Sequence, residues 1–295
     1  MTCYHPLLAY RESGKLVFNK PFPHAKGFNL PCGQCVGCRL KYSQEWAVRL
    51  MHENQMHEES SFITLTMNDE YLSTRVNPSS LDKTEFQRFM KRLRKRYGKQ
   101  IRYFHCGEYG EKNHRPHYHA ILFGVDFEDK ELFQVRDEIR LYTSKTLADL
   151  WPYGFVTIGE VTMESCAYVA RYVLKKFKGK DADKHYIRWD PLTGEGTSID
   201  PEYATMSRKP GIGKSWFETY KEDVYPHDYV VMNKHKIRPP RYYDNLLSEE
   251  ELKTIKEKRA EELPEVIDKY NESMDRLWVE EAVKENRLNI LIRDL

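Results

Sequence analysis

Two histidines separated by one residue, His117 and His119, have the spacing of two ligands to one metal ion. They lie in segment 115–124, which is rich in β-branched, aromatic and aliphatic residues and is delimited by Pro116 and Gly124. Side chains alternate faces along a strand, so both imidazoles would point to the same side, about 7 Å apart. Imidazole nitrogens are common ligands of divalent cations. The pair therefore predicts half of a metal site on a rigid strand.

A third ligand is expected from a neighbouring strand. Residues 101–108 also have the composition of a strand, and the eight-residue loop 109–116 leads from them into the histidine strand. The two segments can therefore pair antiparallel, which would bring Glu108 close to the imidazoles. Alternation of side chains does not by itself exclude three other candidates, which are His105, Glu111 and His114.

A second group of metal-binding residue types lies near the N-terminus. Cys32, Cys35 and Cys38 form a C-x2-C-x2-C run, and Cys3 lies upstream. Four thiolates would complete a tetrahedral structural zinc site, with His5 as the substitute if Cys3 is not a ligand. An iron–sulfur cluster is less well supported, because the run lacks the fourth cysteine followed by proline.

Two tyrosines could supply a nucleophile. Tyr168 and Tyr172 are four residues apart in the helix expected over residues 163–177, so both hydroxyls would emerge from one face. Tyrosines at this spacing commonly anchor a helix on a sheet. A phenol has a pKa of about 10, however, and neighbouring cations are what a tyrosine needs to react near neutral pH. Such cations follow each tyrosine within one turn, namely Arg171, Lys175 and Lys176.

A strongly basic helix is expected earlier in the chain, beginning after Ser80 or Asp82. Its outward side carries many cations and almost no acids, so it is either a solvated face or a surface that contacts nucleic-acid phosphates. The cations are Lys91, Arg92, Arg94, Lys95 and Arg96.

These motifs require a folded scaffold of strands and helices. We expect strands at 61–67, 101–108, 115–124 and 155–161. Helices are expected at 39–57, from residue 83 onward, at 128–150 and at 163–177. Beyond residue 248 we expect two charged helices, broken at Pro264. Residues 1–30 are expected to be irregular, and residues 179–200 to form a mobile loop. A glycine-rich basic loop at 207–215 does not fit a P-loop, but its backbone could approach phosphates.

Composition and charge narrow the class of protein. Aromatic residues make up 13% of the 295 residues, which argues for a folded chain. No apolar run is long enough to span a membrane, and the first thirty residues lack an export signal, so we expect a reducing cytoplasm. Residues 246–295 carry a net charge of −5, which leaves +7 on residues 1–245. A basic body with an acidic tail is typical of nucleic-acid binding.

Together, the motifs resemble those of the HUH endonucleases, the nucleases of rolling-circle replication initiators, relaxases and some transposases. Residues 62–66 resemble the first motif of that family, residues 115–119 the second, and the tyrosines and lysines of 168–176 the third. With the cysteine cluster, residues 107–110 and residues 207–213, the resemblance narrows to replication initiators of gokushovirus-type microviruses, which are small single-stranded DNA phages. It covers residues 1 to about 245.

The resemblance implies an α+β fold with a central antiparallel sheet flanked by helices, similar to RNA-recognition-motif domains. It implies an N-terminal zinc element with its helix over residues 1–58, a nuclease domain over 59–245 and an acidic helical tail over 246–295.

The resemblance also implies an activity. The chain would nick single-stranded DNA at a phage origin and later rejoin strands. The metal, Mg²⁺ or Mn²⁺, would be held by His117, His119 and Glu108, and the catalytic residues would be Tyr168, Tyr172, Lys175 and Lys176. A tyrosine would form a 5′-phosphotyrosine and free a 3′-OH for rolling-circle replication. DNA contacts are expected from Lys91, Arg92, Lys95, Arg115 and Arg171.

The expected partners are origin DNA and the host replication machinery in the host bacterial cytoplasm. We expect a monomer that does not bind membranes. The alternative is a zinc-stabilised protein that binds single-stranded nucleic acid without catalysis. The tyrosine helix favours the nuclease, because binding alone does not require it.

Overall fold

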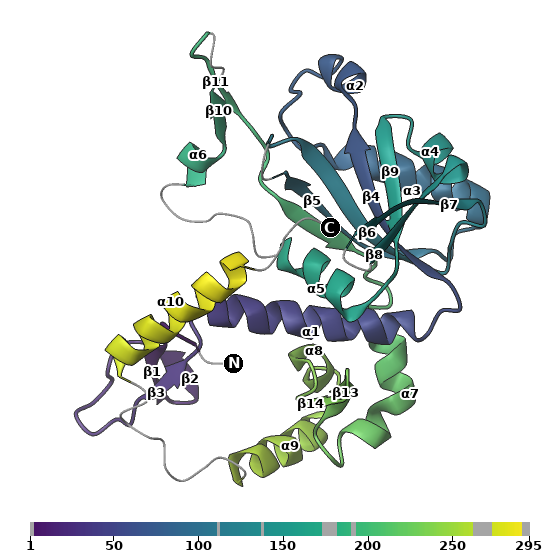
Figure 1. The fold of residues 1–295 in the computed structure, drawn as a ribbon. Helices are drawn as coiled ribbons and strands as arrows, with labels where there is room; N and C mark the ends of the chain where they lie inside the picture. Colours follow the sequence, from purple (N-terminus) through teal and green to yellow (C-terminus); the bar gives the residue numbers. More distant parts are fainter. Residues whose placement is uncertain are drawn as a thin grey trace. The chain divides into compact units, whose positions relative to one another are not determined.

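The computed structural model of the chain describes residues 3–110, 113–136, 139–172, 182–189, 193–261 and 273–290. The chain divides into two compact units, one formed by residues 1–44 with 247–295 and the other by residues 45–246. The first unit therefore combines the two ends of the chain. The second contains the large sheet that dominates Figure 1.

A seven-stranded antiparallel sheet organises the second unit. Its strand order is β12-β5-β6-β4-β9-β8-β7, and β6 is an interior strand next to the central β4. The strands are β4 (Ser60–Met67), β5 (Arg102–Tyr109), β6 (Pro116–Phe123), β7 (Lys130–Arg136), β8 (Ile139–Ser144), β9 (Gly154–Gly159) and β12 (Tyr203–Met206). The α+β class with a central antiparallel sheet is confirmed.

One face of the sheet is covered by α3 (Lys83–Tyr97) and α4 (Lys145–Leu150). Asp82 caps α3, accepting a hydrogen bond from the Thr84 amide at 2.8 Å, as one of the two predicted caps. The apolar side chains of α3 face Tyr118, Ala120 and Leu122 of β6, all fully buried. Alternate residues of β6 therefore fill this core and leave the two histidines for the other face.

The other face is covered by α1 (Val36–Asn54) and α5 (Met163–Tyr172). Their buried side chains pack against Ile121 and Phe123 of β6, which share a face with His117 and His119. The expected helix over 163–177 is confirmed as far as Tyr172, and residues 173–177 lie outside the described part of the chain.

The expectation of a single helix over residues 128–150 is wrong. Residues 130–136 and 139–144 form the antiparallel strand pair β7–β8, and α4 begins only at Lys145. Alternation in Ile139-x-Leu141-x-Thr143 and pairing of β8 with β9 outweigh the local helix propensity. The outermost strand β7 remains strongly exposed, with Leu132 58% and Phe133 63% accessible.

Two segments expected to lack regular structure contain strands. Within 1–30, the described part contains the sheet β2-β1-β3, with β1 at Leu7–Glu12, β2 at Lys15–Val17 and β3 at Phe28–Leu30. Ser13 and Gly14, with φ of 48° and 79°, make the two-residue turn of a twisted hairpin. Within 179–200, the described part contains α6 (Ala182–His185), β10 (Ile187–Trp189) and β11 (Gly196–Ser198).

The short helix α2 (Asp69–Ser73) lies between β4 and α3. The elements that follow β12 are α7 (Lys214–Val224), the hairpin of β13 (Val230–Met232) with β14 (His235–Ile237), α8 (Arg241–Asp244), α9 (Glu249–Glu261) and α10 (Met274–Ile290). The two charged C-terminal helices are thus α9 and α10, while Pro264 lies outside the described residues. Among the described helices, none combines the length and the apolar character that a membrane span requires.

An aromatic cluster joins α1 to α7 and α8 within the second unit. The ring of His52 stacks on Trp216 with centroids 3.4 Å apart, and its Nδ1 is 2.9 Å from the Tyr243 hydroxyl. His52 is only 2% exposed, and this burial lowers its pKa to about 3. The imidazole is therefore neutral in the folded protein.

This burial predicts an acid-dependent loss of stability. Between about pH 6.5 and pH 3 the unfolded chain binds a proton at His52 and the folded chain does not, so the free energy of unfolding falls as the pH falls. The contribution is at most about 1.4 kcal/mol per pH unit. In urea titrations, His52→Gln should show a shallower fall over this window. The exposed His227→Gln is the control, and parallel curves for His52→Gln and the native chain would contradict the assignment.

Candidate active site and metal centre

Three side chains converge on the face of the sheet that carries α5. Glu108 of β5 is directly opposite His117 of β6, and His119 follows on the same face. Their ligand atoms all lie within 4.8 Å of one another, close enough for one metal ion to bind all three. Glu108 Oε1 is 2.8 Å from Nε2 of each histidine. The structure therefore brings the three predicted ligands together.

The second nitrogen of each histidine is fixed by a neighbour. Nδ1 of His117 donates to the Arg115 carbonyl at 3.0 Å, and Nδ1 of His119 is 2.9 Å from Oγ1 of Thr64. Thr64 is the direct partner of His119 on β4. Hydrogen bonds of this kind select the tautomer that leaves Nε2 available to a metal, and they hold the ring in orientation.

The arrangement of donors and acceptors suits a cation. If Nδ1 of neutral His117 donates, then Nε2 presents a lone pair to a carboxylate oxygen only 2.8 Å away. Two acceptors at this distance repel each other unless a proton or a metal ion lies between them. Burial raises the pKa of Glu108, but in the state in which protons fill these gaps, both histidines donate to the carboxylate and their hydrogen bonds and charge lower its pKa to about 2. The carboxylate is therefore ionised near neutral pH.

The other candidates for third ligand are placed elsewhere or are not described. His105 is on the opposite face, stacked on Phe86 with centroids 3.4 Å apart and only 1% exposed. His114 is exposed in the turn before β6, with a φ of 48°. Glu111 lies outside the described residues. Glu108 is thus the third member of the group that the described residues form.

Tyr168 lies against this group. Its hydroxyl donates to Glu108 Oε1 at 3.2 Å, and its ring meets His119 edge-on with centroids 5.2 Å apart. The side chain is 7% exposed, whereas His117 keeps 17% of its side chain accessible to solvent. Cζ of Arg171 lies 5.8 Å from the centroid of the Tyr168 ring. One predicted tyrosine is therefore adjacent to the candidate ligands, with a cation beside it.

The rest of the predicted tyrosine motif is only partly described. Tyr172 is the last residue of α5, but its side chain lies outside the described part. Lys175 and Lys176 also lie outside the described residues. Their proximity to the metal ligands stays a prediction.

The predicted DNA-contacting residues do not gather at one place. Lys91 and Lys95 are exposed on α3, which covers the face of the sheet opposite the histidines. Arg92, on the same helix, donates to the Leu150 carbonyl at 2.8 Å. Arg115 donates to the Met67 carbonyl at 2.7 Å and forms an ion pair with Asp69. These contacts connect the start of β6 to the end of β4.

The glycine-rich loop at 207–215 is bound to α1 of the second unit. The Gly213 amide donates to Glu53 at 2.7 Å, and the Ile212 carbonyl accepts from Arg49 at 3.0 Å. Gly213 itself has a φ of 77°, which glycine adopts without strain, at the start of α7. The Lys214 amide is also bonded, to the Gly211 carbonyl, and the Ser207 amide to the Tyr103 carbonyl, so these three amides of the loop are engaged within the protein.

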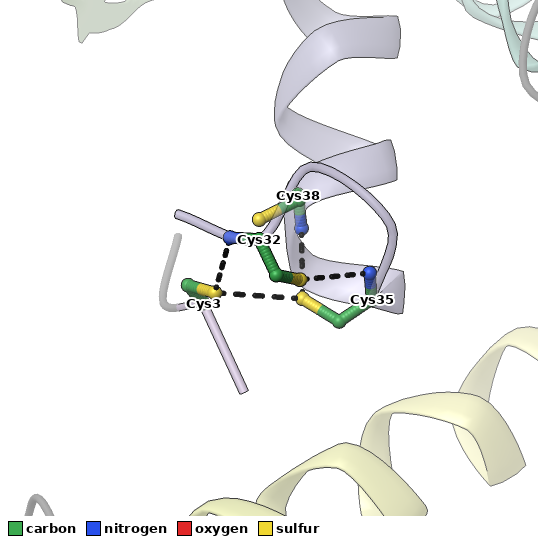
Figure 2. A group of neighbouring side chains, drawn as sticks. All are labelled: Cys3, Cys32, Cys35 and Cys38. Atoms are coloured by element: carbon green, nitrogen blue, oxygen red, sulfur yellow. Dashed lines mark hydrogen bonds between the residues drawn. The ribbon is translucent and has the colours of Figure 1, made fainter. Parts of the chain in front are cut away.

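The four predicted cysteines form a second candidate metal centre, in the first unit. Figure 2 shows Cys3, Cys32, Cys35 and Cys38 turned toward one another at the start of α1. Their sulfurs lie within 4.8 Å of one another, and those of Cys3 and Cys35 are 3.9 Å apart. Tetrahedral zinc with bonds of about 2.3 Å needs sulfur separations of about 3.8 Å. The spacing is therefore that of ligands to one ion, and all four thiols are free.

Backbone amides donate hydrogen bonds to these sulfurs, which favours the thiolate form that binds a cation. Amides donate to three of the sulfurs, at 3.2 Å to Cys3, 3.3 Å to Cys32 and 3.4 Å to Cys35. Burial raises the pKa of Cys35, but amides of Cys38 and Tyr4 outweigh it and hold the pKa at about 7. Burial raises the pKa of Cys38 to about 12. All four thiols can ionise together only if a cation offsets their charge.

The C-terminal helix contributes residues that sequence reasoning missed. Leu277 of α10 is 4% exposed and packs with Tyr4 and Cys35. Glu281 of α10 accepts from the Val36 amide at 3.3 Å, at the first turn of α1, and pairs with His5. No sequence signal links residues so far apart in the chain. Thr64 was likewise missed as the partner of His119, although strand pairing could have identified it.

Comparison with known proteins gives consistent matches. The family model of the ORF2-type replication-associated proteins matches residues 60–177, the segment from β4 through α5 that contains Glu108, both histidines and both tyrosines. No solved protein structure matches the chain.

Individual viral proteins match over most of the chain. Replication-associated protein VP4 of Bdellovibrio phage phiMH2K is 34% identical over 83% of this chain and 76% of that protein. Replication-associated protein ORF2 of Spiroplasma virus 4 is 35% identical over 78% of this chain and 73% of that protein. Replication-associated protein ORF4 of Chlamydia phage 1 is 34% identical over 75% of this chain and 54% of that protein.

The role of Thr64 is open to a direct test. Thr64→Val keeps the β-branched shape but cannot bond Nδ1 of His119, so binding of Mn²⁺, used as the probe cation, should weaken about 10-fold in calorimetric titrations. Thr64→Ser should restore the affinity. Thr66→Val is the matched control, because it lies on the same strand opposite His117, whose Nδ1 is held by the Arg115 carbonyl. Equal Mn²⁺ affinities of Thr64→Val and the native chain would refute this role.

Proposed function

Because the chain belongs to the family of phage replication-associated proteins, we propose that it initiates DNA replication by nicking single-stranded DNA at a phage origin with a tyrosine nucleophile. The cut would leave a 5′-phosphotyrosine and a free 3′-OH from which host polymerases extend. The phosphotyrosine bond conserves the energy of the phosphodiester, so the same centre can later rejoin strands.

One observation carries this proposal: the Tyr168 hydroxyl lies 3.2 Å from Glu108, next to two histidines aligned for the same cation. A protein that only binds DNA has no need for a phenol beside a group of metal ligands. Aromatic residues that bind bases are exposed on a surface, whereas Tyr168 is 7% exposed. The arrangement therefore favours nucleophilic chemistry over binding alone.

Glu108, His117 and His119 would hold the cation, for which two imidazoles and a carboxylate are a suitable donor set. Bound there, Mg²⁺ or Mn²⁺ would polarise the scissile phosphate and offset the charge that builds on it. Nδ1 contacts to Arg115 and Thr64 keep the imidazoles aligned before DNA arrives. This preorganisation reduces the cost of ordering the site during the reaction.

Tyr168 would act as the nucleophile. Its oxygen forms a bond to phosphorus while the bond from phosphorus to the 3′-oxygen breaks, and the leaving 3′-oxygen takes up a proton. Glu108 would orient the phenol, and because it would also be a ligand of the cation it is not available as the base, so the phenolic proton would pass to solvent. The guanidinium of Arg171, 5.8 Å from the ring centroid, would offset part of the negative charge at the reacting phenol.

Tyr172 would serve as the alternative nucleophile one helical turn away. With one tyrosine bound to DNA, the other can cleave after a round of synthesis. Lys175 and Lys176 would stabilise the phenolate and the scissile phosphate, and Lys91, Arg92, Lys95 and Arg115 would contact DNA beyond the site. These roles come from the sequence motif and from charge.

The cysteine cluster would bind one zinc ion with a structural role. Four sulfurs leave no open position for a substrate, and closed sites of this type contribute to folding. We place this protein in the host bacterial cytoplasm, acting as a monomer with the host replication machinery.

Changing the tyrosines tests the mechanism. Tyr168→Phe and Tyr172→Phe should each retain some cleavage of an origin oligonucleotide in Mn²⁺, and the double variant should form no covalent protein–DNA adduct on denaturing gels. Phe keeps the apolar ring and loses one hydrogen bond, so each change should alter stability by no more than about 1 kcal/mol.

The matched control for this experiment is Tyr118→Phe. Tyr118 lies between the histidines but faces the other core, where its hydroxyl donates to Glu85 at 2.5 Å. Its loss should reduce stability and leave adduct formation intact. Normal adduct formation by the tyrosine double variant would refute the assignment.

Zinc removal tests the structural site. We expect one zinc ion per purified chain, lost in Cys32→Ala and retained in Cys166→Ala, which lies in the other unit. Chelation should increase hydrogen exchange in residues 3–44 and, because Leu277 packs on Cys35, in α10 as well. Strands β5 and β6 should keep their protection. Purified protein without tightly bound zinc would contradict the site.

A further inference from the structure

The N-terminal element has an unusual charge distribution. Residues 13–44 contain no Asp or Glu, although the chain average of 45 acids in 295 residues would place about five in a segment of this length. The segment carries five cations, all exposed, namely Lys15, Lys20, Lys26, Arg39 and Lys41. Their side chains face solvent, and the segment contributes no acid of its own, although Glu12 just before it is the cross-strand partner of Lys15. This surface is therefore suited to a polyanion.

Exposed aromatic rings lie among these cations. Phe18 is 58% exposed and Phe22 is 53% exposed, in the stretch between Lys15 and Lys26. We refer to residues 15–26 as the Lys–Phe segment. Phe18 directly follows β2. The interior positions of the small sheet are taken by Ala9 and Tyr10, which are buried, so neither phenylalanine is needed there.

We propose that the Lys–Phe segment is a second binding surface for single-stranded DNA, made of residues that take no part in the nicking site. Lys15, Lys20 and Lys26 would contact phosphates, and Phe18 and Phe22 would stack on bases. This inference rests on the proposed function in one respect, that single-stranded DNA is the substrate. Nothing in the segment itself is required for the chemistry at Glu108, His117 and His119.

The combination of cations and exposed aromatic rings on this surface favours single-stranded nucleic acid over other polyanions. Surfaces that bind single strands combine cations along the backbone with aromatic side chains on which bases stack, and any base can stack. In a duplex the faces of the bases are covered by their neighbours, so exposed rings gain little there. The three lysines with two accessible phenylalanines match the first pattern.

Removing the rings tests stacking. The full-length, zinc-loaded protein is titrated into a labelled oligonucleotide of about 20 nucleotides and into an abasic strand of equal length, with anisotropy as the readout. Phe18→Ala with Phe22→Ala should weaken binding of the normal strand at least about 5-fold and change binding of the abasic strand little. Phe133→Ala, an equally exposed phenylalanine on β7, is the matched control.

Removing the charges tests the phosphate contacts. Replacing Lys15, Lys20 and Lys26 by Gln should lower the slope of log affinity against log salt by about 2, because each phosphate contact on a single strand contributes about 0.7. The control replaces three exposed lysines of the other unit, Lys145, Lys234 and Lys236, by Gln. A similar slope change in both triple variants would show a general charge effect and overturn the proposal.

The other possible results of these experiments also distinguish this proposal from its alternatives. Unchanged binding of the normal strand by the phenylalanine double variant overturns the proposal, as does loss of binding to anionic lipid vesicles without loss of DNA binding. Adduct formation at saturating oligonucleotide and the zinc content should match the native chain, because the variants leave both candidate metal centres intact. If the native chain forms no adduct while these variants still lose DNA affinity, the nicking proposal fails and this one stands.

Discussion

Antiparallel pairing of β5 with β6 is the constraint on which the candidate active site depends. The register sets Glu108 opposite His117, and alternation then places His119 on the same face. A slip of one residue would move the carboxylate to the opposite face, where α3 covers the sheet. The site therefore has no separate scaffold of its own. It is one face of a sheet whose other face is a hydrophobic core, and the pairing that forms the core also aligns the ligands.

Contacts on the opposite face of the sheet hold β6 against a slip of one residue. Tyr118, between the two histidines, is fully buried, and its hydroxyl donates to Glu85 at 2.5 Å and lies 2.9 Å from the Asp82 carbonyl. Displacing the strand would strip the buried Glu85 carboxylate of a hydrogen bond, which is costly in an apolar interior. The Tyr118 hydroxyl thus adds to the packing that resists a slip, whereas the pairing of β5 with β6 aligns the histidines.

Much of this arrangement could be predicted from the sequence because it depends on local rules. Alternation determined which residues share a face with His117, and a short connection to β5 determined the antiparallel partner. The strand pair β7–β8 was missed, because an exposed strand such as β7 keeps residues compatible with a helix and is specified by pairing with its neighbours. Thr64 belongs to residues 62–66, which resemble the first motif, but its contact with His119 could be identified only from the register between β4 and β6.

In the first unit, prediction from the sequence is limited for a different reason. Among its described residues, the buried apolar cluster around the cysteines is small and consists of Tyr4, Cys35 and Leu277, while Ala9 and Tyr10 are buried in the small sheet. Small elements of this kind need a metal or a disulfide, and free thiols at metal-binding distance indicate the metal. Leu277 and Glu281 reach this cluster from the far end of the chain, so the acidic tail has a structural partner that no local pattern reveals. The tail therefore belongs to the same cooperative element as the cysteines, and its acidic composition leaves the cations of the Lys–Phe segment as the part of that element suited to DNA.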